Sequence, residues 1–544
     1  MKTTITTRII APFTITLIFL LTAASTSGQS LYLPLNHTYD YHLQKALYTP
    51  EFRFHTSIQA WRTGEITNVI NYDSLLRSNY LTRNSHRGPG WEKTWNKTFN
   101  TDVVTLKRPG YWFAINPIID FDLGQDFTEA NHTYTNTRGL ELKGQLGKDV
   151  AFYTAVRENQ ADFPNYLNTW IKANGVIPGQ GKIHTILDNG FDFNNANAYI
   201  AYTPGKYFAF QLGQGKNFFG DGYRSLILSD NSFDYPYLKA EINFWHIKYS
   251  VLYTQMMDLN NNPEGTGWNK KYTTMHYLSW AATKRLTISF FDAVVWAAQD
   301  STQYRGFDWS YANPIIFLRP AEFSVGSPDN ALLGMAASYI FGKHTVVYGQ
   351  LMLDEFKLDE ITSGNGWWAN KYAWQLGFKT FDAFKIKNLY LQSEFNWARP
   401  YMYTHRKVIT NYGHYNQPLA HPLGANFYES VSFIRYHVKR LYFQYEFQYA
   451  LFGDDENGLN YGHDIYESHN ENRPHDYDNY VGQGLKTTIT LHDLTLSYLI
   501  NPAYNLNLAI GYTHRTQSNS QTTINTSYIH IGLRTSLFNN YYDL

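Results

Sequence analysis

Apolar and polar residues alternate along short runs over most of the chain from residue 110 onward. The clearest run is Leu441–Ala450, LYFQYEFQYA, in which every second residue is apolar or aromatic and glutamine and glutamate lie between. Successive side chains of a β-strand point to opposite faces, so the run predicts a strand with one apolar face. We expect Leu441, Phe443, Tyr445 and Phe447 on that face and Gln444, Glu446 and Gln448 on the other.

The same alternation of apolar and polar residues recurs along the chain, and turn residues separate the runs. Leu389–Trp397 and Thr345–Asp354 alternate in this way, whereas Thr203–Lys206 and Asn501–Ala503 are short turns that contain proline. Other connections are long and polar. The last run, Tyr528–Phe538, is predicted as a closing strand and is followed by residues 539–544, NNYYDL.

Alternation fits either a water-facing sandwich or a membrane barrel whose apolar face meets lipid. Three features favour the barrel. The polar faces carry Gln, Glu and Asn rather than dense charge, aromatic residues crowd the strand ends, and short turns alternate with long loops. We therefore expect an all-β fold, an antiparallel transmembrane β-barrel over residues 110–544 with about 16 to 18 strands.

The first 109 residues do not follow this pattern. Lys2 and Arg8 precede an apolar run, Ile9–Leu21, and small residues follow, so residues 1–28 are predicted to be a secretory signal peptide. Residues 29–109 are mixed in character. Apolar spacing predicts helices over Glu65–Asn79 and Trp91–Phe99, and we expect this segment to form a small helical cap or plug.

Composition narrows the classes of function. The 544 residues include 17% aromatic side chains, no cysteine, and 45 basic against 45 acidic residues. The charge balance argues against a nucleic-acid partner, and the missing cysteine excludes disulfides and a lipid-modified cysteine. No motif for a nucleophile, a phosphate loop or a closed metal site occurs, so we expect no enzyme activity, no cofactor and no bound metal. His463, Asp464 and His469 fall in a polar stretch predicted to be a solvated loop.

One stretch, Gly213–Phe244, interrupts the repetition. Its first part holds four glycines, which favour a tight irregular backbone, and no helix follows them as a phosphate site would require. Polar side chains then gather where an apolar core could not hold them without partners. We expect this stretch inside or at the mouth of the barrel, with Arg224 as its electrostatic anchor and Asp221 and Asp230 as the partners of Arg224. A bracing network and direct ligand contact both remain open.

Three stretches carry a resemblance to a known family. Phe219–Asn231 (FGDGYRSLILSDN) and Tyr415–Asn426 (YNQPLAHPLGAN) resemble segments of the capsule-assembly Wzi family of outer-membrane barrels. Asn313–Asn330 (NPIIFLRPAEFSVGSPDN) is similar to the Bacteroidetes branch of that family, which includes barrels related to the gliding-motility protein RemB. These stretches follow the expected order along the chain, and the N-terminal segment departs most from the family.

The resemblance implies a barrel of the cell outer membrane, plugged by helices, that helps to hold surface polysaccharide on the cell. Its partners would be outer-membrane lipid, a surface polysaccharide and other outer-membrane proteins. Trp367 and Trp368 are candidate aromatic platforms for sugar, or else part of an interfacial girdle. The candidate residues for ligand binding or for a network in the lumen are Asp221, Tyr223, Arg224, Ser225, Ser229, Asp230, Asn231, Arg319, Glu322, His421 and Asn426.

Two other functions remain open on the sequence. The chain could be a component of the gliding-motility or type IX secretion apparatus that acts through protein partners, or it could be a diffusion porin. Arg319 and Glu322 lie beside Pro320 at an apparent strand end, where they would act mainly as internal braces. The nature of the lumen, filled or open, separates the porin from the other two functions.

Overall fold

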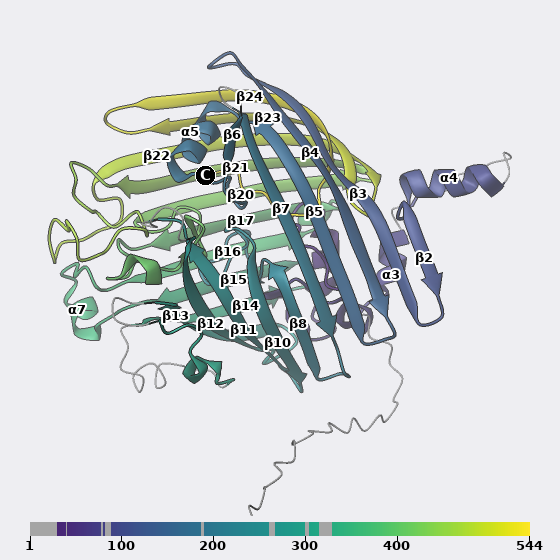
Figure 1. The fold of residues 1–544 in the computed structure, drawn as a ribbon, viewed down its shortest axis with the longest axis horizontal. Coiled ribbons are helices and arrows are strands. Elements are labelled where there is room, and N and C mark those ends of the chain that lie inside the picture. The colour runs from purple at the N-terminus through teal and green to yellow at the C-terminus, as the bar shows by residue number, and fades with distance from the viewer. Residues whose placement is uncertain are drawn as a thin grey trace, which may run out of the picture.

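The computed structural model describes residues 30–39, 41–77, 80–81, 89–186, 190–260, 267–299, 304–314 and 329–544. In these residues the chain forms a closed barrel of 18 antiparallel strands, which confirms the predicted fold class (Figure 1). The last strand, β24 (Thr523–Thr535), pairs with the first, β3 (Tyr111–Asp126), with Arg534 opposite Asp120. Closure leaves no free strand edge, which is the condition for a sheet to cross a lipid bilayer.

The strands between β3 and β24 follow one another around the wall in sequence order. They are β4 (Asn131–Leu146), β5 (Val150–Asp162), β7 (Gly190–Tyr202), β8 (Phe208–Gly215), β10 (Tyr235–Phe244), β11 (Ile247–Asp258), β12 (Asn269–Trp280), β13 (Leu286–Ala297), β14 (Asn330–Phe341), β15 (Thr345–Leu353), β16 (Tyr372–Phe381), β17 (Leu389–Ala398), β20 (Phe427–Val438), β21 (Leu441–Asp454), β22 (Leu485–Asn501) and β23 (Leu506–Ser518).

Six shorter strands accompany the wall among the described residues. β2 (Val104–Arg108) pairs with β3, and β6 (His184–Ile186) pairs with β7. β1 (Ile58–Gln59) pairs with β9 (Phe218–Phe219), and β18 (Gly413–His414) pairs with β19 (Gln417–Pro418). The pairing of β1 with β9 joins two segments that are far apart in the sequence, so it ties together parts of the chain that fill the barrel.

The alternation along β21 has the predicted orientation. Leu441 is 46% exposed on the outer surface, whereas Glu446 and Gln448 are buried in the lumen. The same holds on β22, where Leu494 is 44% exposed. Exposed apolar side chains on the outside of a closed barrel form the band that meets lipid in membrane barrels.

Connections at the two ends of the barrel differ in length. Residues 245–246 and 439–440 make two-residue turns at one end, the short-turn end, whereas loops 399–426 and 455–484 lie at the other, the long-loop end. In bacterial membrane barrels the short turns face the periplasm. The long loops carry α5 (Asn165–Asn174), α7 (Leu358–Ser363) and the 3-10 turns η1 (Trp309–Ala312) and η3 (Val408–Thr410), whereas η2 (Ala383–Lys385) lies at the short-turn end.

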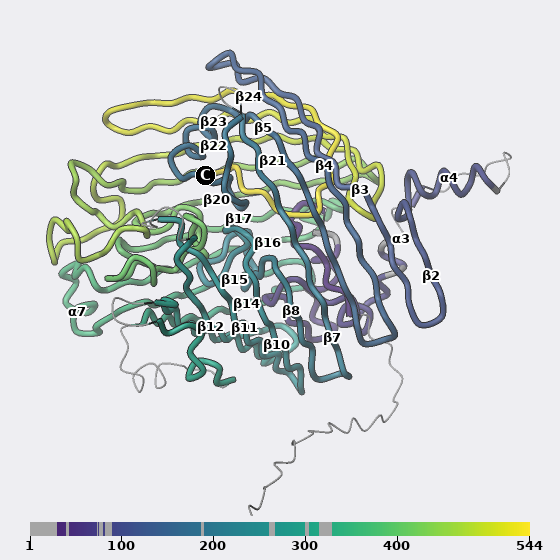
Figure 2. Tube along the Cα trace, viewed as in Figure 1, coloured from purple at the N-terminus to yellow at the C-terminus, as the bar shows by residue number. Residues whose placement is uncertain are grey.

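Residues 30–77, the N-terminal plug, enter the lumen and confirm the predicted small helical plug (Figure 2). The plug contains α1 (Tyr41–Leu47), α2 (Thr63–Thr67) and α3 (Tyr72–Arg77) around a small core that includes Leu43, Leu47, Trp61 and Ile66. Glu65 of the plug pairs with Lys248 of the wall at 2.9 Å between its Oε2 and the lysine Nζ. The predicted single helix from Glu65 is wrong, because Asn71 accepts a hydrogen bond from the Ser74 N–H and starts a new helix.

The predicted helix over Trp91–Phe99 is confirmed as α4 (Pro89–Phe99), which projects beyond the short-turn end in Figure 1. Two further segments fill the lumen. They are the inner loop, residues 216–234 between β8 and β10, and the C-terminal tail, residues 536–544 after β24. None of the described helices is long and apolar enough to span a membrane.

Candidate functional site

The inner loop keeps its irregular shape through the hydroxyl of Ser225. This hydroxyl donates to the carbonyl of Phe219 at 2.6 Å and accepts from the N–H groups of Ile227 and Leu228 at 3.1 and 3.2 Å. The side chains of Leu226, Ile227 and Leu228 are fully buried in the main apolar cluster of the lumen. The loop therefore has an apolar anchor, and its polar residues can be held in fixed positions beside it.

A glutamate of the wall binds the backbone of the inner loop. Both carboxylate oxygens of Glu394 on β17 accept backbone hydrogen bonds, from the N–H groups of Tyr223 at 2.8 Å and Arg224 at 2.9 Å. Gly222 allows this approach, because a Cβ there would lie 2.7 Å from a Glu394 oxygen and 2.7 Å from the Arg224 carbonyl oxygen. A glycine is therefore required on contact distance alone.

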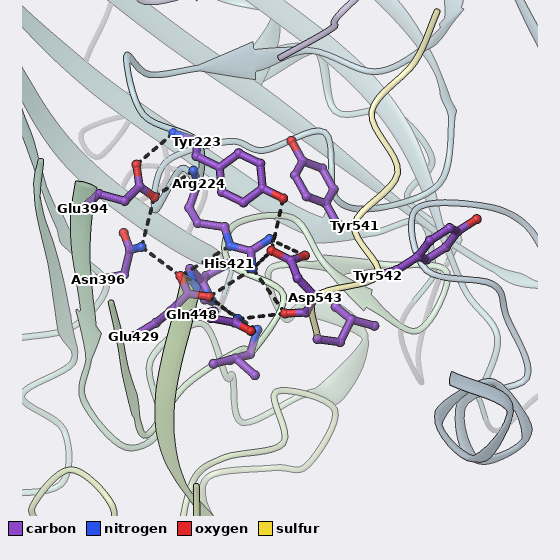
Figure 3. A network of polar contacts seen from close by, with 12 residues as sticks. Tyr223, Arg224, Glu394, Asn396, His421, Glu429, Gln448, Tyr541, Tyr542 and Asp543 are labelled. Atoms are coloured by element: carbon purple, nitrogen blue, oxygen red, sulfur yellow. Dashed lines mark hydrogen bonds and ion pairs between the residues drawn. The ribbon is translucent and has the colours of Figure 1, made fainter. Parts of the chain in front are cut away.

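Arg224 is the electrostatic centre of the lumen, but its predicted partners are wrong (Figure 3). Its guanidinium Nη2 donates to Glu429 Oε1 on β20 at 3.0 Å and to Asp543 Oδ2 of the C-terminal tail at 2.8 Å. Nε and Nη1 complete forked pairs with the same two carboxylates at 3.4 and 3.3 Å. Arg224 is 1% exposed, so its charge is balanced entirely within the protein.

Asp221 and Asp230 hold other parts of the lumen contents. Asp221 accepts hydrogen bonds of 2.6 Å from the hydroxyls of Tyr48 and Thr56, both in the N-terminal plug. Asp230 accepts from the Tyr541 hydroxyl at 2.6 Å and from the Asn539 amide at 2.9 Å, both in the C-terminal tail. The inner loop bends at Arg224, so the three charged side chains reach different neighbours.

The second predicted stretch packs directly on the first. The N–H of Ser229 donates to the carbonyl of Leu419 at 2.8 Å, and the Asn231 amide donates to the carbonyl of Pro418 at 3.3 Å. His421 Nε2 lies 2.7 Å from Glu429, the same carboxylate that binds Arg224. The His421 Nδ1 accepts from the Leu423 N–H, so Nε2 carries the proton and donates it to Glu429.

Burial lowers the pKa of the His421 imidazole, against the opposing effect of Glu429. The ring therefore stays neutral around pH 7, and Arg224 supplies the positive charge that Glu429 faces. Asn426 holds the base of the same loop, because its amide donates to the carbonyls of Gly453 and Gln483 and accepts from the Gly482 N–H. Tyr223 completes the centre through its hydroxyl, which donates to Asp543 at 3.1 Å.

The structure brings nine of the predicted lumen residues into two touching segments, the inner loop and the loop 399–426. They are Asp221, Tyr223, Arg224, Ser225, Ser229, Asp230, Asn231, His421 and Asn426. All nine are buried, so their role in ligand contact stays a prediction. Arg319 and Glu322 lie outside the described residues. In the described part of the chain, no cluster of three or more residues is arranged to hold a metal ion.

Comparison with solved structures supports the fold. Wzi, an outer-membrane protein involved in group 1 capsule assembly in Escherichia coli and a carbohydrate-binding β-barrel, is similar over 93% of this chain and 100% of its own, with a TM-score of 0.54 and 13% identity. This chain has the fold of Wzi. OprD of Pseudomonas aeruginosa, with a TM-score of 0.41 and 10% identity, covers 81% of this chain and 96% of its own. No family model and no curated protein matches the sequence.

The candidate aromatic platform lies among the long loops of this Wzi-like barrel. The Trp368 ring packs on His469 with the ring centres 4.8 Å apart, and the Arg473 guanidinium lies 4.0 Å from its centre. Trp367 contacts Trp368 edge to face at 6.3 Å. Both tryptophans are half-buried and lie in the connection between β15 and β16.

Sequence reasoning missed the residues that complete the Arg224 site. Glu429 and Glu394 each occupy a polar position of an alternating strand, where many lumen-facing residues look alike. Asp543 lies beyond the predicted closing strand, where the unusual NNYYDL ending was the available signal. An exposed aromatic residue was also missed: Trp309 in the loop between β13 and β14 is 82% exposed at the long-loop end.

Proposed function

We propose that the chain is a non-enzymatic outer-membrane barrel that attaches or assembles surface polysaccharide at the cell surface. One observation carries the proposal. The two stretches that resemble the Wzi family, Phe219–Asn231 and Tyr415–Asn426, meet around Arg224 and Glu429 inside a barrel with the fold of carbohydrate-binding Wzi. The proposal rests on these two stretches meeting at one buried centre, because function depends on the site rather than on the barrel alone.

The long-loop end offers the surface that would meet the polymer. Trp309, Tyr304 and Tyr480 are 82%, 72% and 64% exposed there. Aromatic rings present a flat apolar face at little cost in conformational entropy, and such a face packs well on the C–H side of a sugar ring. The buried centre around Arg224 would then act indirectly, by fixing the loops that carry these rings.

The test compares a strain that lacks this gene with strains that carry it in variant form. Trp309→Ala combined with Tyr480→Ala should lower cell-bound polysaccharide per folded barrel several-fold and raise the polymer shed into the medium, because two flat aromatic faces are lost. Tyr207→Ala, which changes a 49% exposed tyrosine at the short-turn end, is the matched control and should retain polymer normally.

Equal retention in the deletion strain and in the parent would contradict the proposal outright. The same cultures address the second candidate, a component that acts through protein partners in gliding or secretion. α4 favours that candidate, because it projects beyond the short-turn end and exposes Trp91. Loss of gliding or secretion with normal polymer retention in the deletion strain would replace the first proposal by the second.

A further inference from the structure

A polar cavity of about 330 Å³ lies between the C-terminal tail and the barrel wall. Its wall comes mainly from β3, β4, β5 and β20 to β24, and its other side is formed by residues 538–543 of the tail and residues 36–39 of the N-terminal plug. Four buried atoms that belong to its lining side chains have no hydrogen-bond partner within the described protein: Asp120 Oδ1, Arg157 Nε, Glu446 Oε1 and Arg534 Nε. Buried polar groups without protein partners require water, so this cavity is aqueous.

The cavity reaches from the tail toward the short-turn end. Towards the short-turn end it is lined by Ser497, Asn507 and Ser536, which lie near the ends of β22, β23 and β24. Towards the long-loop end it stops at Tyr166 and Leu167 of α5. The lining below this closure comes from neighbouring strands and mixes polar with apolar side chains.

The closure consists of the tail bound to α5. The Tyr166 hydroxyl donates to the carbonyl of Tyr542 at 2.7 Å, and Leu544 is buried in the apolar cluster around Leu167 and Ile171. Deeper in the lumen, Asp543 binds Arg224 and Tyr541 binds Asp230. The end of the tail thus separates the cavity from the long-loop side.

The tail is attached in a way that lets it move without disturbing the sheet. Among the described residues, positions 538–544 make no backbone-to-backbone hydrogen bond, and every polar contact to them involves at least one side chain. Displacement of the tail would therefore break side-chain contacts and leave all strand pairs intact. Arg224 would keep Glu429 as a partner, whereas buried Asp230 would lose its contacts with Tyr541 and Asn539, and this cost favours the closed position of the tail.

We propose that the cavity is a closed aqueous path for small hydrophilic solutes and that the C-terminal tail is its displaceable gate. The wall carries Asp120, Asp122, Glu446 and Asp493 against Arg157, Arg435 and Arg534. Acidic and basic groups are nearly balanced, so the path takes small uncharged or zwitterionic solutes and discriminates weakly between ions. This conduction is an activity beyond the proposed attachment of polysaccharide and does not depend on it.

The experiment measures single-channel conductance of the purified full-length barrel in planar bilayers. The native protein should be closed nearly all the time. Asp543→Asn removes one charge-assisted contact of the tail and should raise the open probability about tenfold or more. Asp476→Asn, which changes an acid of the exposed loop 455–484, is the matched control and should leave the barrel closed.

Tyr541→Phe provides a milder opening variant should Asp543→Asn fail to accumulate as folded barrel. It removes the contacts of the Tyr541 hydroxyl with Asp230 and His37, keeps the pairing of Asp543 with Arg224, and should produce a smaller rise in open probability. Both variants staying as closed as the native protein would overturn the proposal. An open probability of the tail variants equal to that of Asp476→Asn would also overturn the proposal, since the contacts of the tail would then be irrelevant to closure.

Chemical modification of an introduced cysteine shows whether the current passes through this cavity. The native chain has no cysteine, so Thr495→Cys, which lines the cavity, introduces a single thiol. In the Asp543→Asn background a charged methanethiosulfonate should reduce the current through Thr495→Cys. It should spare Ser393→Cys, which lies between the lumen-facing residues Gln392 and Glu394 and therefore on the outer face. An opened current that resists block at Thr495 would come from elsewhere in the barrel and would refute the path.

Discussion

Arg224 connects two carboxylates that reach it from different parts of the chain. Glu429 belongs to the barrel wall, and Asp543 belongs to the C-terminal tail. Glu429 is fully buried and also accepts hydrogen bonds from His421, Gln448 and Asn396. A buried ion pair of this kind fixes geometry more than it adds stability, yet removing one partner is costly because the other charge loses its compensation.

We predict that Arg224→Ala destabilises the folded barrel by ~3–5 kcal/mol, because Glu429 and Asp543 would lose their counter-charge. Arg224→Lys should recover only part of this loss, since an ammonium cannot form both forked pairs. The measurement is reversible unfolding by denaturant in lipid bilayers, followed through the mobility difference between folded and heat-unfolded barrel.

Arg108→Ala serves as the control, because Arg108 is exposed on β2 and should change stability very little. Wild-type stability in Arg224→Ala would contradict the bracing role. Reduced polysaccharide retention per folded barrel in Arg224→Ala would point instead to direct ligand contact, the alternative that burial alone leaves to experiment.

Individual strands carry the information about orientation in the membrane. Leu494 in the middle of β22 and Leu441 at the turn end of β21 are almost equally exposed, at 44% and 46%. Their surroundings should nevertheless differ, because one lies near the centre of the apolar band and the other near its edge. Depth in the bilayer, rather than exposure, decides the cost of placing a charge at each position.

We predict that Leu494→Arg costs ~2–4 kcal/mol and Leu441→Arg only ~0–1 kcal/mol of folding free energy in bilayers. Both variants add the same side chain at nearly the same exposure, so each serves as the control for the other. Equal costs, or a larger cost at Leu441, would mean that the apolar band is placed wrongly along the strands.

Strands and turns were predictable from the sequence because alternation is a local property. The wall positions of Leu441–Ala450 and the irregular inner loop both follow from neighbouring residues. The partners of Arg224 do not, because barrel closure and the fold-back of the tail decide that Glu429 and Asp543 come closer than Asp221. The helix predicted from Glu65 fails for a local reason that apolar spacing overlooks: the Asn71 side chain caps a new helix.

At the scale of the whole molecule, three segments of the same chain occupy the lumen and hold one another. His37 of the N-terminal plug marks their meeting point. Its N–H donates to the Asn539 side chain of the tail at 2.9 Å, and its Nε2 lies 3.1 Å from the Tyr541 hydroxyl. Burial lowers the pKa of the His37 imidazole to about 4, so the ring is neutral at pH 7.

We predict that acid loosens the contact between plug and tail. The pKa of His37 is lower in the folded state than the ordinary value of about 6.5, so its stabilising contribution is complete above pH 6.5 and declines as the pH falls toward 4. The total effect is at most about 3 kcal/mol. Hydrogen exchange of residues 30–39 and 536–544, corrected for the intrinsic rate, should accelerate between pH 7 and pH 5.

His37→Gln keeps a polar side chain but cannot be protonated in this range, so its exchange should depend much less on pH. His475→Gln, which changes an exposed histidine of the loop 455–484, should behave like the native protein. The same acceleration in His37→Gln as in the native chain would assign the pH response to other groups.

The position of the tail makes the ion pairs of the lumen depend on the last residues of the chain. β24 closes the sheet against β3, and the tail that follows it carries the second carboxylate of Arg224. The charge of Arg224 is therefore compensated by two carboxylates only while the tail occupies the lumen. A barrel that lost residues 536–544 would keep the strand pairs of its wall and leave Arg224 with Glu429 alone.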